Sequence, residues 1–239
     1  MGIVRKQSIN NTIITVIGFG IGALNTLYLY TNFLTDEYYG LVSVILATAA
    51  LLMPLLSFGV HNTLVKFYSS FTRKKETDSF LNLMLFLPFA LIVPIAIFSY
   101  VANDFIADFL SSENELVKDY VWHIFLIGMA MAYFEVFYAW ARVQLKSVFG
   151  NFMKEIFGRL CIAVLLILVS FKTITVDQFL IALVVVYILR MAIMKGYAYD
   201  LNPPSLIFKL PNNTKAIIKY AAVIILGGSA AVVVLGIDK

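Results

Sequence analysis

Long apolar runs are the feature that most constrains what this chain can fold into. Seven of them are separated by short charged or turn-forming segments, at residues 10–33, 41–68, 80–102, 119–141, 156–172, 175–198 and 217–236. A helix of about 20 apolar residues crosses the roughly 30 Å hydrocarbon core of a bilayer. The runs are continuously apolar and do not alternate as barrel strands do. The sequence therefore predicts an all-α integral membrane protein with about seven transmembrane helices.

The composition agrees with this prediction. Hydrophobic residues make up 61% of the 239 residues and charged residues only 13%, whereas a soluble domain has about 25% charged residues. The net charge of +4 does not indicate nucleic acid as a partner, because basic cytoplasmic loops make many membrane proteins basic. The first run continues to about residue 33 without a cleavage site, so we interpret it as a retained span and not as a signal peptide.

Basic residues predict the direction in which the spans cross the membrane. With the N-terminus in the cytoplasm, all but three of the 18 lysines and arginines fall at inner ends or in inner loops. The three exceptions are Lys118, Lys172 and Lys239. Most acidic residues fall on the outer side. We therefore expect a multi-pass protein whose N-terminus is cytoplasmic.

The strongest change in composition falls at residues 202–215, which hold three of the six prolines. We expect a domain boundary there. Residues 1–201 would form a six-helix transmembrane lobe, and residues 202–239 a cytoplasmic loop followed by the first helix of a second lobe. A separate basic segment, residues 142–159, mixes apolar and charged residues at helical spacing. It is typical of a segment lying on an anionic lipid surface, or of a short helix between spans.

Proline residues interrupt two of the apolar runs. Pro54 lies in the second run, and Pro88 and Pro94 lie in the third. Proline removes a backbone donor and bends a helix, and transporters place such bends where backbone lines a cavity. Proline is also frequent in membrane helices in general. The pattern predicts bends at these positions and leaves open whether they are functional or static.

Small residues mark one face of the first run. Gly18 and Gly22, in the stretch GFGIG, form a small-xxx-small pair that allows another helix to approach closely. They lie inside a span, so they are not the glycines of a dinucleotide-binding loop. Asn25 follows three residues after Gly22. We expect its amide to face a cavity or to bond to a neighbouring helix.

Glu135 is the one acidic residue that this topology leaves inside the membrane. Helix rise places it about 7 Å below the midplane, and places His61 of the second run about 10 Å below it. Ionisable residues inside a span usually have a partner. His61, with Asn62 beside it, is one candidate partner, and Arg142, two turns below Glu135, is another. We expect four polar residues of the spans to serve substrate binding or coupling: Glu135, His61, Asn25 and Asn62. Glu135 would pair with a cation, or carry a proton or Na⁺. The alternative is that Glu135 reaches the interface or stays neutral in a polar packing contact.

Catalysis has little support in the sequence. Two histidines and one cysteine do not provide a usual zinc site. The sequence has no G-x-S-x-G, H-E-x-x-H or P-loop motif. We therefore predict that the protein is not an enzyme and needs no cofactor.

Several segments resemble the Wzx-type polysaccharide flippases, which belong to a superfamily (MOP) that also contains the MATE antiporters and the lipid II flippases. The segments are MGIVRKQSINNTI, TNFLTDEYYGLVS, SFGVHNTLVKFYS, AYFEVFYAWARVQLKSVFGNFMKE and KYAAVIILGGSAAVVVLGIDK. The resemblance covers essentially the whole chain. It implies two lobes of helices arranged as a V, around a cavity that opens alternately to each face of the membrane.

The resemblance also implies a substrate and a location. Wzx-type flippases move undecaprenyl-pyrophosphate-linked oligosaccharide from the cytoplasmic to the periplasmic leaflet of the bacterial inner membrane, for O-antigen or capsule synthesis. With such a substrate, bonding to sugar hydroxyls is a third role open to Glu135. The present chain ends after one lobe and the first helix of a second. We therefore expect it to be a fragment, or to pair with a chain that supplies the missing C-terminal lobe.

An anionic substrate implies cations near its path. Lys66, Arg142, Arg159 and Arg190 cluster at the inner ends of the spans, where positive potential would attract the head group. The positive-inside rule alone explains the same residues. Two other functions stay open at this point. One is a MATE-like antiporter of small molecules or drugs, coupled to H⁺ or Na⁺. The other is an inactive fragment or a non-transporting membrane subunit.

Overall fold

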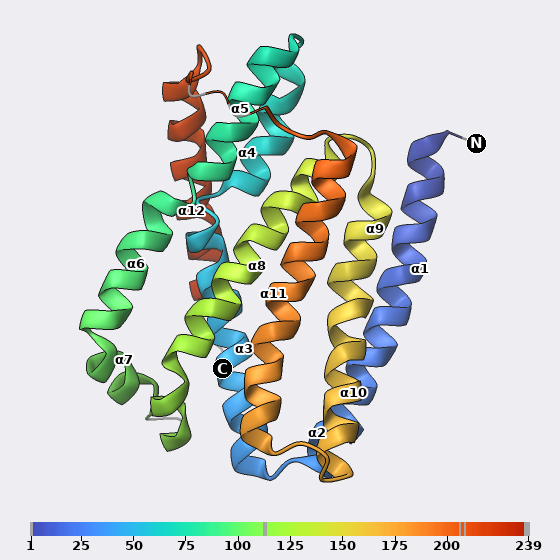
Figure 1. Ribbon diagram of the computed structural model, residues 1–239, viewed down its shortest axis with the longest axis vertical. Helices are drawn as coiled ribbons and strands as arrows, with labels where there is room; N and C mark the ends of the chain where they lie inside the picture. Colours follow the sequence, from blue (N-terminus) through green and yellow to red (C-terminus); the bar gives the residue numbers. More distant parts are fainter. Residues whose placement is uncertain (1, 112–113, 206, 208, 237–239) are drawn as a thin grey trace.

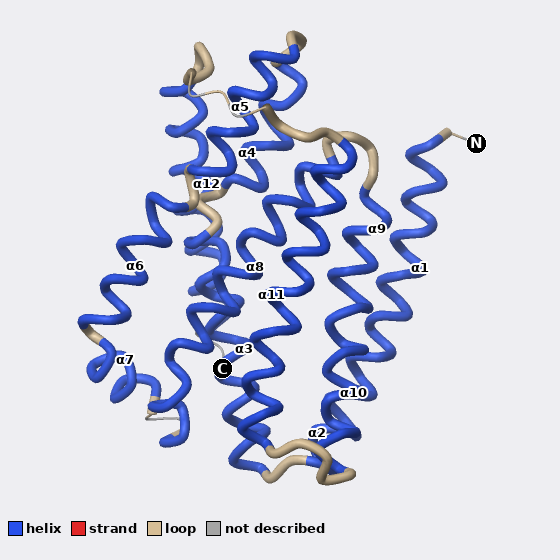
Figure 2. The backbone as a smooth tube through the Cα atoms, viewed as in Figure 1, coloured by secondary structure: helices blue, strands red, loops and turns tan. Residues whose placement is uncertain are grey.

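The computed structural model describes residues 2–111, 114–205, 207 and 209–236, with side chains described as far as residue 225. These residues form helices joined by turns and loops, and no strand occurs among them (Figure 2). The helices are α1 (Ile3–Leu24), α2 (Tyr30–Phe33), α3 (Asp36–Leu56), α4 (Val60–Phe67), α5 (Lys74–Phe86), α6 (Phe89–Val101), α7 (Asn103–Leu110), α8 (Val121–Arg142), α9 (Ser147–Phe152), α10 (Gly158–Ser170), α11 (Val176–Leu201) and α12 (Thr214–Gly236).

Five helical stretches in the described part are long and apolar enough to cross a membrane. They are Ile3–Phe33, Asp36–Leu56, Lys74–Val101, Glu115–Arg142 and Val176–Leu201. The prediction of an all-α membrane protein is therefore confirmed. These stretches correspond to five of the seven predicted spans. The other two predicted spans correspond to α9–α10, which carries the charged residues Lys154, Glu155 and Arg159, and to α12.

The connections between helices alternate between two ends of the bundle (Figure 1). The N-terminus and the α4–α5, α8–α9 and α11–α12 connections lie at one end. The α2–α3, α7–α8 and α10–α11 connections lie at the other. The first end carries the basic segment Arg73–Lys75. This alternation is the one expected of a chain that crosses a membrane repeatedly.

Helix α8 is the centre of the bundle. It packs against α3, α4 and α11, and 83% of its most apolar 18-residue window is buried, compared with 17% for the N-terminal helix. Trp140 and Phe134 of α8 are fully buried in one core with Phe80 of α5. Ile127 of α8 joins a second core with Phe179 of α11. An acidic residue on α8 is therefore enclosed by the bundle.

The second predicted span is two helices. Helix α3 ends at Leu56, two residues after Pro54, and α4 begins at Val60. Gly59, which links them, has φ 62°, a left-handed conformation that favours glycine. A Cβ there would lie 2.6 Å from the carbonyl oxygen of Ala221 in α12. Helix α12 therefore packs directly against the break in the second span.

The third predicted span is also divided. A turn at Leu87 and Pro88 separates α5 from α6, and Figure 1 shows the two helices at different inclinations. Pro94 lies inside α6, which continues to Val101. The chain thus breaks at two of the three prolines singled out from the sequence.

Candidate functional site

A cavity of about 260 Å³ lies among α3, α8, α9–α10 and α11. Five charged residues line it, together with apolar side chains and Tyr187. These five are Glu135, Lys154, Glu155, Arg159 and Arg190, and we call their site the charged cavity. Ionisable residues are rare inside membrane proteins and mark functional sites.

Glu135 is paired with Lys154. The Nζ of Lys154 donates to Oε1 of Glu135 at 2.6 Å, and the Glu135 side chain is only 12% exposed. Neither His61 nor Arg142, the partners expected from the sequence, makes this contact. A lysine that neutralises Glu135 stabilises the carboxylate where water is scarce.

Lys154 reaches Glu135 because the helix that carries it starts earlier than expected. The predicted span began at residue 156, but the helix begins at Ser147 and runs through a π-helical turn, Met153–Phe157, to Ser170. Lys154 lies seven residues after Ser147, and Glu135 lies seven residues before Arg142, where α8 ends. Each is therefore about 10 Å from the same end of the bundle. The expectation that this segment lies on the lipid surface was wrong for these residues.

The second ion pair lies within one helix. Nη1 of Arg159 donates to Oε2 of Glu155 and to its carbonyl oxygen, at 2.7 Å in each case. Glu155 belongs to the π-helical turn, and Arg159 lies two residues after its end; π-helical turns often occur at functional sites. The Arg159 guanidinium is thus fixed at two points.

Helix α1 covers Arg159. A Cβ on Gly18 would lie 2.6 Å from the carbonyl oxygen of Glu155 and 2.9 Å from Nη1 of Arg159, so only glycine fits. The predicted close approach of another helix at Gly18 and Gly22 is therefore confirmed. Asn25 donates from Nδ2 to the carbonyl oxygen of Arg159 at 2.8 Å, so its amide bonds to a neighbouring helix. It opens a second π-helical turn, Asn25–Leu29, which packs against α10.

Arg190 is the most deeply buried cation of the cavity. It is 9% exposed, and its guanidinium carbon lies 4.4 Å from the ring centroid of Phe134 and 4.8 Å from that of Tyr187. Within the described residues it makes no ion pair, and its Nε has no hydrogen-bond partner. Aromatic faces stabilise a buried cation only in part. Arg190 therefore has capacity for an anion.

The charges of the cavity do not balance. Three cations face two carboxylates, and each carboxylate already has its own partner. The cavity therefore has a net positive charge, inside a bundle whose low polarity strengthens electrostatic interactions. Such an arrangement can hold an anionic group without a metal ligand set.

The remaining candidate residues lie outside this cavity. Nδ1 of His61 lies 3.4 Å from Oγ of Ser57, and His61 interacts with Glu135 only through longer-range electrostatics. Asn62 is exposed. Lys66 is exposed, with Nζ 3.7 Å from the ring centroid of Tyr220 in α12. Arg142 is exposed at the end of α8.

Sequence reasoning placed Lys154 and Glu155 in a loop, although a signal for their true location was present. No proline separates Ser147 from Ser170, and a run of this length without proline is compatible with one continuous helix. Gly150, Asn151 and the charged residues masked this signal, because turn residues and charges together indicate the end of a span. In the structure Lys154 pairs with Glu135 of α8, and Glu155 pairs with Arg159 of its own helix.

The sequence profile of one protein family, described as polysaccharide biosynthesis protein, matches residues 4–239. The chain belongs to this family. The polysaccharide biosynthesis family is that of the Wzx-type flippases in the MOP superfamily, and its members are transporters and not enzymes. No curated protein and no solved structure matches this chain. Family membership and the apolar helices together establish a multi-pass membrane protein of polysaccharide biosynthesis.

Proposed function

We propose that this protein is a flippase that moves undecaprenyl-pyrophosphate-linked oligosaccharide from the cytoplasmic to the periplasmic leaflet of the bacterial inner membrane, for O-antigen or capsule synthesis. The observation that carries the proposal is the net positive charged cavity, in which buried Arg190 has no carboxylate partner among the described residues. A pyrophosphate group is the anion that this family's substrate class would bring there. Membership of the polysaccharide biosynthesis family supports the same conclusion.

In this proposal the N-terminus is cytoplasmic and residues 1–201 form the first lobe. Residues 202–239 begin the second lobe, and α12 packs against the break between α3 and α4. A break at Pro54 beside the second lobe is suited to a change in inclination between the lobes. The charged cavity would then open alternately to the two faces of the membrane.

Glu135 is assigned to coupling and not to phosphate binding, because a carboxylate repels an anion. It holds Lys154 at 2.6 Å, and a pyrophosphate that enters the cavity would compete with it for Lys154. Protonation of Glu135, or its occupation by Na⁺, would release Lys154 to the substrate. We therefore place any coupling to H⁺ or Na⁺ at Glu135.

Complementation tests the proposal. The full reading frame, expressed in a strain that lacks its polysaccharide flippase, should restore surface polysaccharide as seen on a gel. Substitution Arg190→Gln should abolish the restoration at equal protein level. If the full reading frame restores no polysaccharide but lowers drug accumulation, the protein is a MATE-like antiporter. If it does neither, it is a non-transporting subunit or an inactive fragment.

A further inference from the structure

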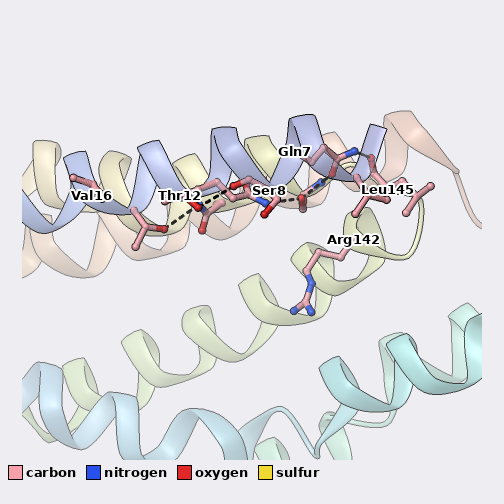
Figure 3. Close-up of a pocket in the computed structure, with 11 residues that line it drawn as sticks. Gln7, Ser8, Thr12, Val16, Arg142 and Leu145 are labelled. Atoms are coloured by element: carbon pink, nitrogen blue, oxygen red, sulfur yellow. Dashed lines mark hydrogen bonds between the residues drawn. The ribbon is translucent and has the colours of Figure 1, made fainter. Parts of the chain in front are cut away.

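A groove of about 580 Å³ lies between the first half of α1 and the end of α8 with the start of α9. Its α1 wall consists mostly of uncharged polar residues at helical spacing: Gln7, Ser8, Asn11, Thr12 and Thr15. Figure 3 shows Gln7, Ser8 and Thr12 in a row along α1. The opposite wall includes Arg142, Leu145, Ser147 and Asn151. We call this feature the hydroxyl groove.

Amide side chains hold the two walls together. Gln7 donates to the carbonyl oxygen of Leu145, and its Oε1 accepts from Oγ of Ser147 at 2.8 Å. Asn11 donates from Nδ2 to Oγ of Ser147 at 2.9 Å, and Asn151 donates to the carbonyl oxygen of Asn11 at 3.0 Å. Polar side chains between membrane helices commonly bond helix to helix in this way. This contact accounts for the amides of the groove.

The contact does not account for the hydroxyls of Ser8 and Thr12. Ser8, Thr12 and Thr15 are exposed. The Thr12 hydroxyl bonds only to the carbonyl oxygen of Ser8 in its own helix, at 3.0 Å, and the Thr15 hydroxyl accepts from Nδ2 of Asn151 at 3.4 Å. Because a hydroxyl both donates and accepts, each of the three keeps a donor or an acceptor for a ligand in the groove.

The neighbouring face of α1 shows what the same helix presents to lipid. Ile9, Ile13 and Ile17 are 45%, 52% and 49% exposed. None of the three lines the groove, and the same side of α1 also carries Lys6 and Asn10 nearer the N-terminus. Polar groups in contact with hydrocarbon are costly. The row of hydroxyls on the groove side of α1 therefore suits a polar occupant better than lipid.

The polar wall of the groove is neutral. No acidic residue lines the groove, and Arg142 is the one charged residue among its described lining residues. In Figure 3 the Arg142 guanidinium points away from the polar side chains of α1. Neutral donors and acceptors in a row match a ligand rich in hydroxyl groups, which is the chemistry of a sugar.

The hydroxyl groove and the charged cavity adjoin along one helix. Asn151 lines the groove and Lys154 lines the charged cavity, and three residues along a helix correspond to about 4.5 Å. The groove lies nearer the end of the bundle that carries the N-terminus. A ligand with a sugar joined to a pyrophosphate would meet the two sites in that order.

We propose that the hydroxyl groove binds the sugar nearest the pyrophosphate of a lipid-linked saccharide, through the hydroxyls of Ser8, Thr12 and Thr15. This assignment rests on the proposed flippase function. It makes α1 the sugar-binding wall and the charged cavity the phosphate-binding site.

The test compares two carriers on the purified full-length protein. Dissociation constants are measured in detergent for undecaprenyl pyrophosphate alone and for the same carrier bearing one N-acetylglucosamine. The double variant Ser8→Ala/Thr12→Val removes two hydroxyls that make no bond between helices. We expect about a tenfold loss of affinity for the sugar-bearing carrier, and an unchanged affinity for the sugar-free carrier.

A matched control is available on the same chain. Thr31 and Ser43 are also exposed, and each bonds to a carbonyl four residues earlier, at 3.1 and 2.9 Å. The double variant Thr31→Val/Ser43→Ala should bind both carriers as the unaltered protein does. Equal affinities of the groove variant and the unaltered protein for the sugar-bearing carrier would overturn the groove assignment alone. An equal loss for both carriers would also overturn it. Failure of the unaltered protein to bind either carrier would overturn the proposed function as well.

Discussion

The charged cavity and the hydroxyl groove are two polar regions along α9–α10 that differ in how their polar groups are used. The cavity holds charged side chains, and two of its three cations are neutralised by Glu135 and Glu155, whereas the most buried cation, Arg190, has no carboxylate partner among the described residues. The groove holds neutral amides and hydroxyls, and the hydroxyls on its α1 wall are exposed. A buried charge without a partner is costly, whereas an exposed hydroxyl at a groove wall needs no partner. In the proposed function, this difference assigns phosphate recognition to the cavity and sugar recognition to the groove.

The largest effect is expected where α1 closes against both regions. Substitution Gly18→Leu places a side chain against the backbone of Glu155, which cannot move aside as a side chain can. Overpacking of this kind costs about 3 kcal/mol, so we expect a much lower melting temperature and little folded protein. Gly20→Leu is the matched control, because a Cβ at Gly20 meets nothing within 4 Å. Equal melting temperatures of the two variants would show that α1 does not need this contact.

The next largest effect distinguishes phosphate binding at Arg190 from a general effect of positive charge on flipping. Substitution Arg190→Gln removes the cation without a carboxylate partner among the described residues, and we expect at least about a tenfold loss of flipping with no loss of thermal stability. Flipping is measured in proteoliposomes with a fluorescent lipid-linked sugar. Lys66→Gln removes a cation that lies over Tyr220, outside the cavity, and should alter flipping less than twofold. Equal losses in the two variants would indicate that only the overall charge matters.

A smaller effect is expected from the ion pair between helices. Glu135→Gln should lower flipping about tenfold at unchanged protein level. The reason is that Lys154 loses the carboxylate partner that controls when its ammonium group can bind the substrate. The double variant Glu135→Gln/Lys154→Gln tests the pairing, because the losses of contacting residues are not additive. Additive losses in the double variant would mean that the two residues act separately. Normal flipping by Glu135→Gln would remove Glu135 from the mechanism.

The smallest effect is expected from the amides of the groove. Gln7→Leu removes the bonds to Leu145 and Ser147, and interhelical hydrogen bonds in membranes contribute about 0.6 kcal/mol on average. We expect a fall of a few degrees in melting temperature. The ratio of affinities for the carrier with and without sugar should stay unchanged. A change in that ratio would show that Gln7 contacts the sugar and is not only a structural bond.

The sequence predicted the class of fold and part of the site. Continuous apolar runs identified helices that cross a membrane, because length and hydropathy are local properties. Gly18 and Gly22 identified the face of α1 that packs closely, and Asn25 was correctly considered as a bond to a neighbouring helix. Glu135 was recognised as unusual from its depth alone. Each of these inferences depends on residues within a few turns of one another.

The partners of these residues could not be predicted in the same way. The pairing of Glu135 with Lys154 depends on where α9 begins relative to the end of α8, and a span placed nine residues too late moved Lys154 into a loop. His61 and Arg142 were reasonable partners by depth, but depth does not specify the direction in which a side chain points. The break after Pro54 followed from proline chemistry, whereas its packing against α12 did not.

By itself, the sequence determined that the chain is helical, that it belongs in a bilayer and that its interior contains an acid. These properties follow from the cost of placing backbone and charge in hydrocarbon. Only the tertiary structure decided which charges meet. Helix packing placed Glu135, Lys154, Glu155, Arg159 and Arg190 around one cavity and left the hydroxyls of α1 facing a neighbouring groove. Contacts between distant helices depend on their relative rotation and depth, which no single stretch of sequence encodes.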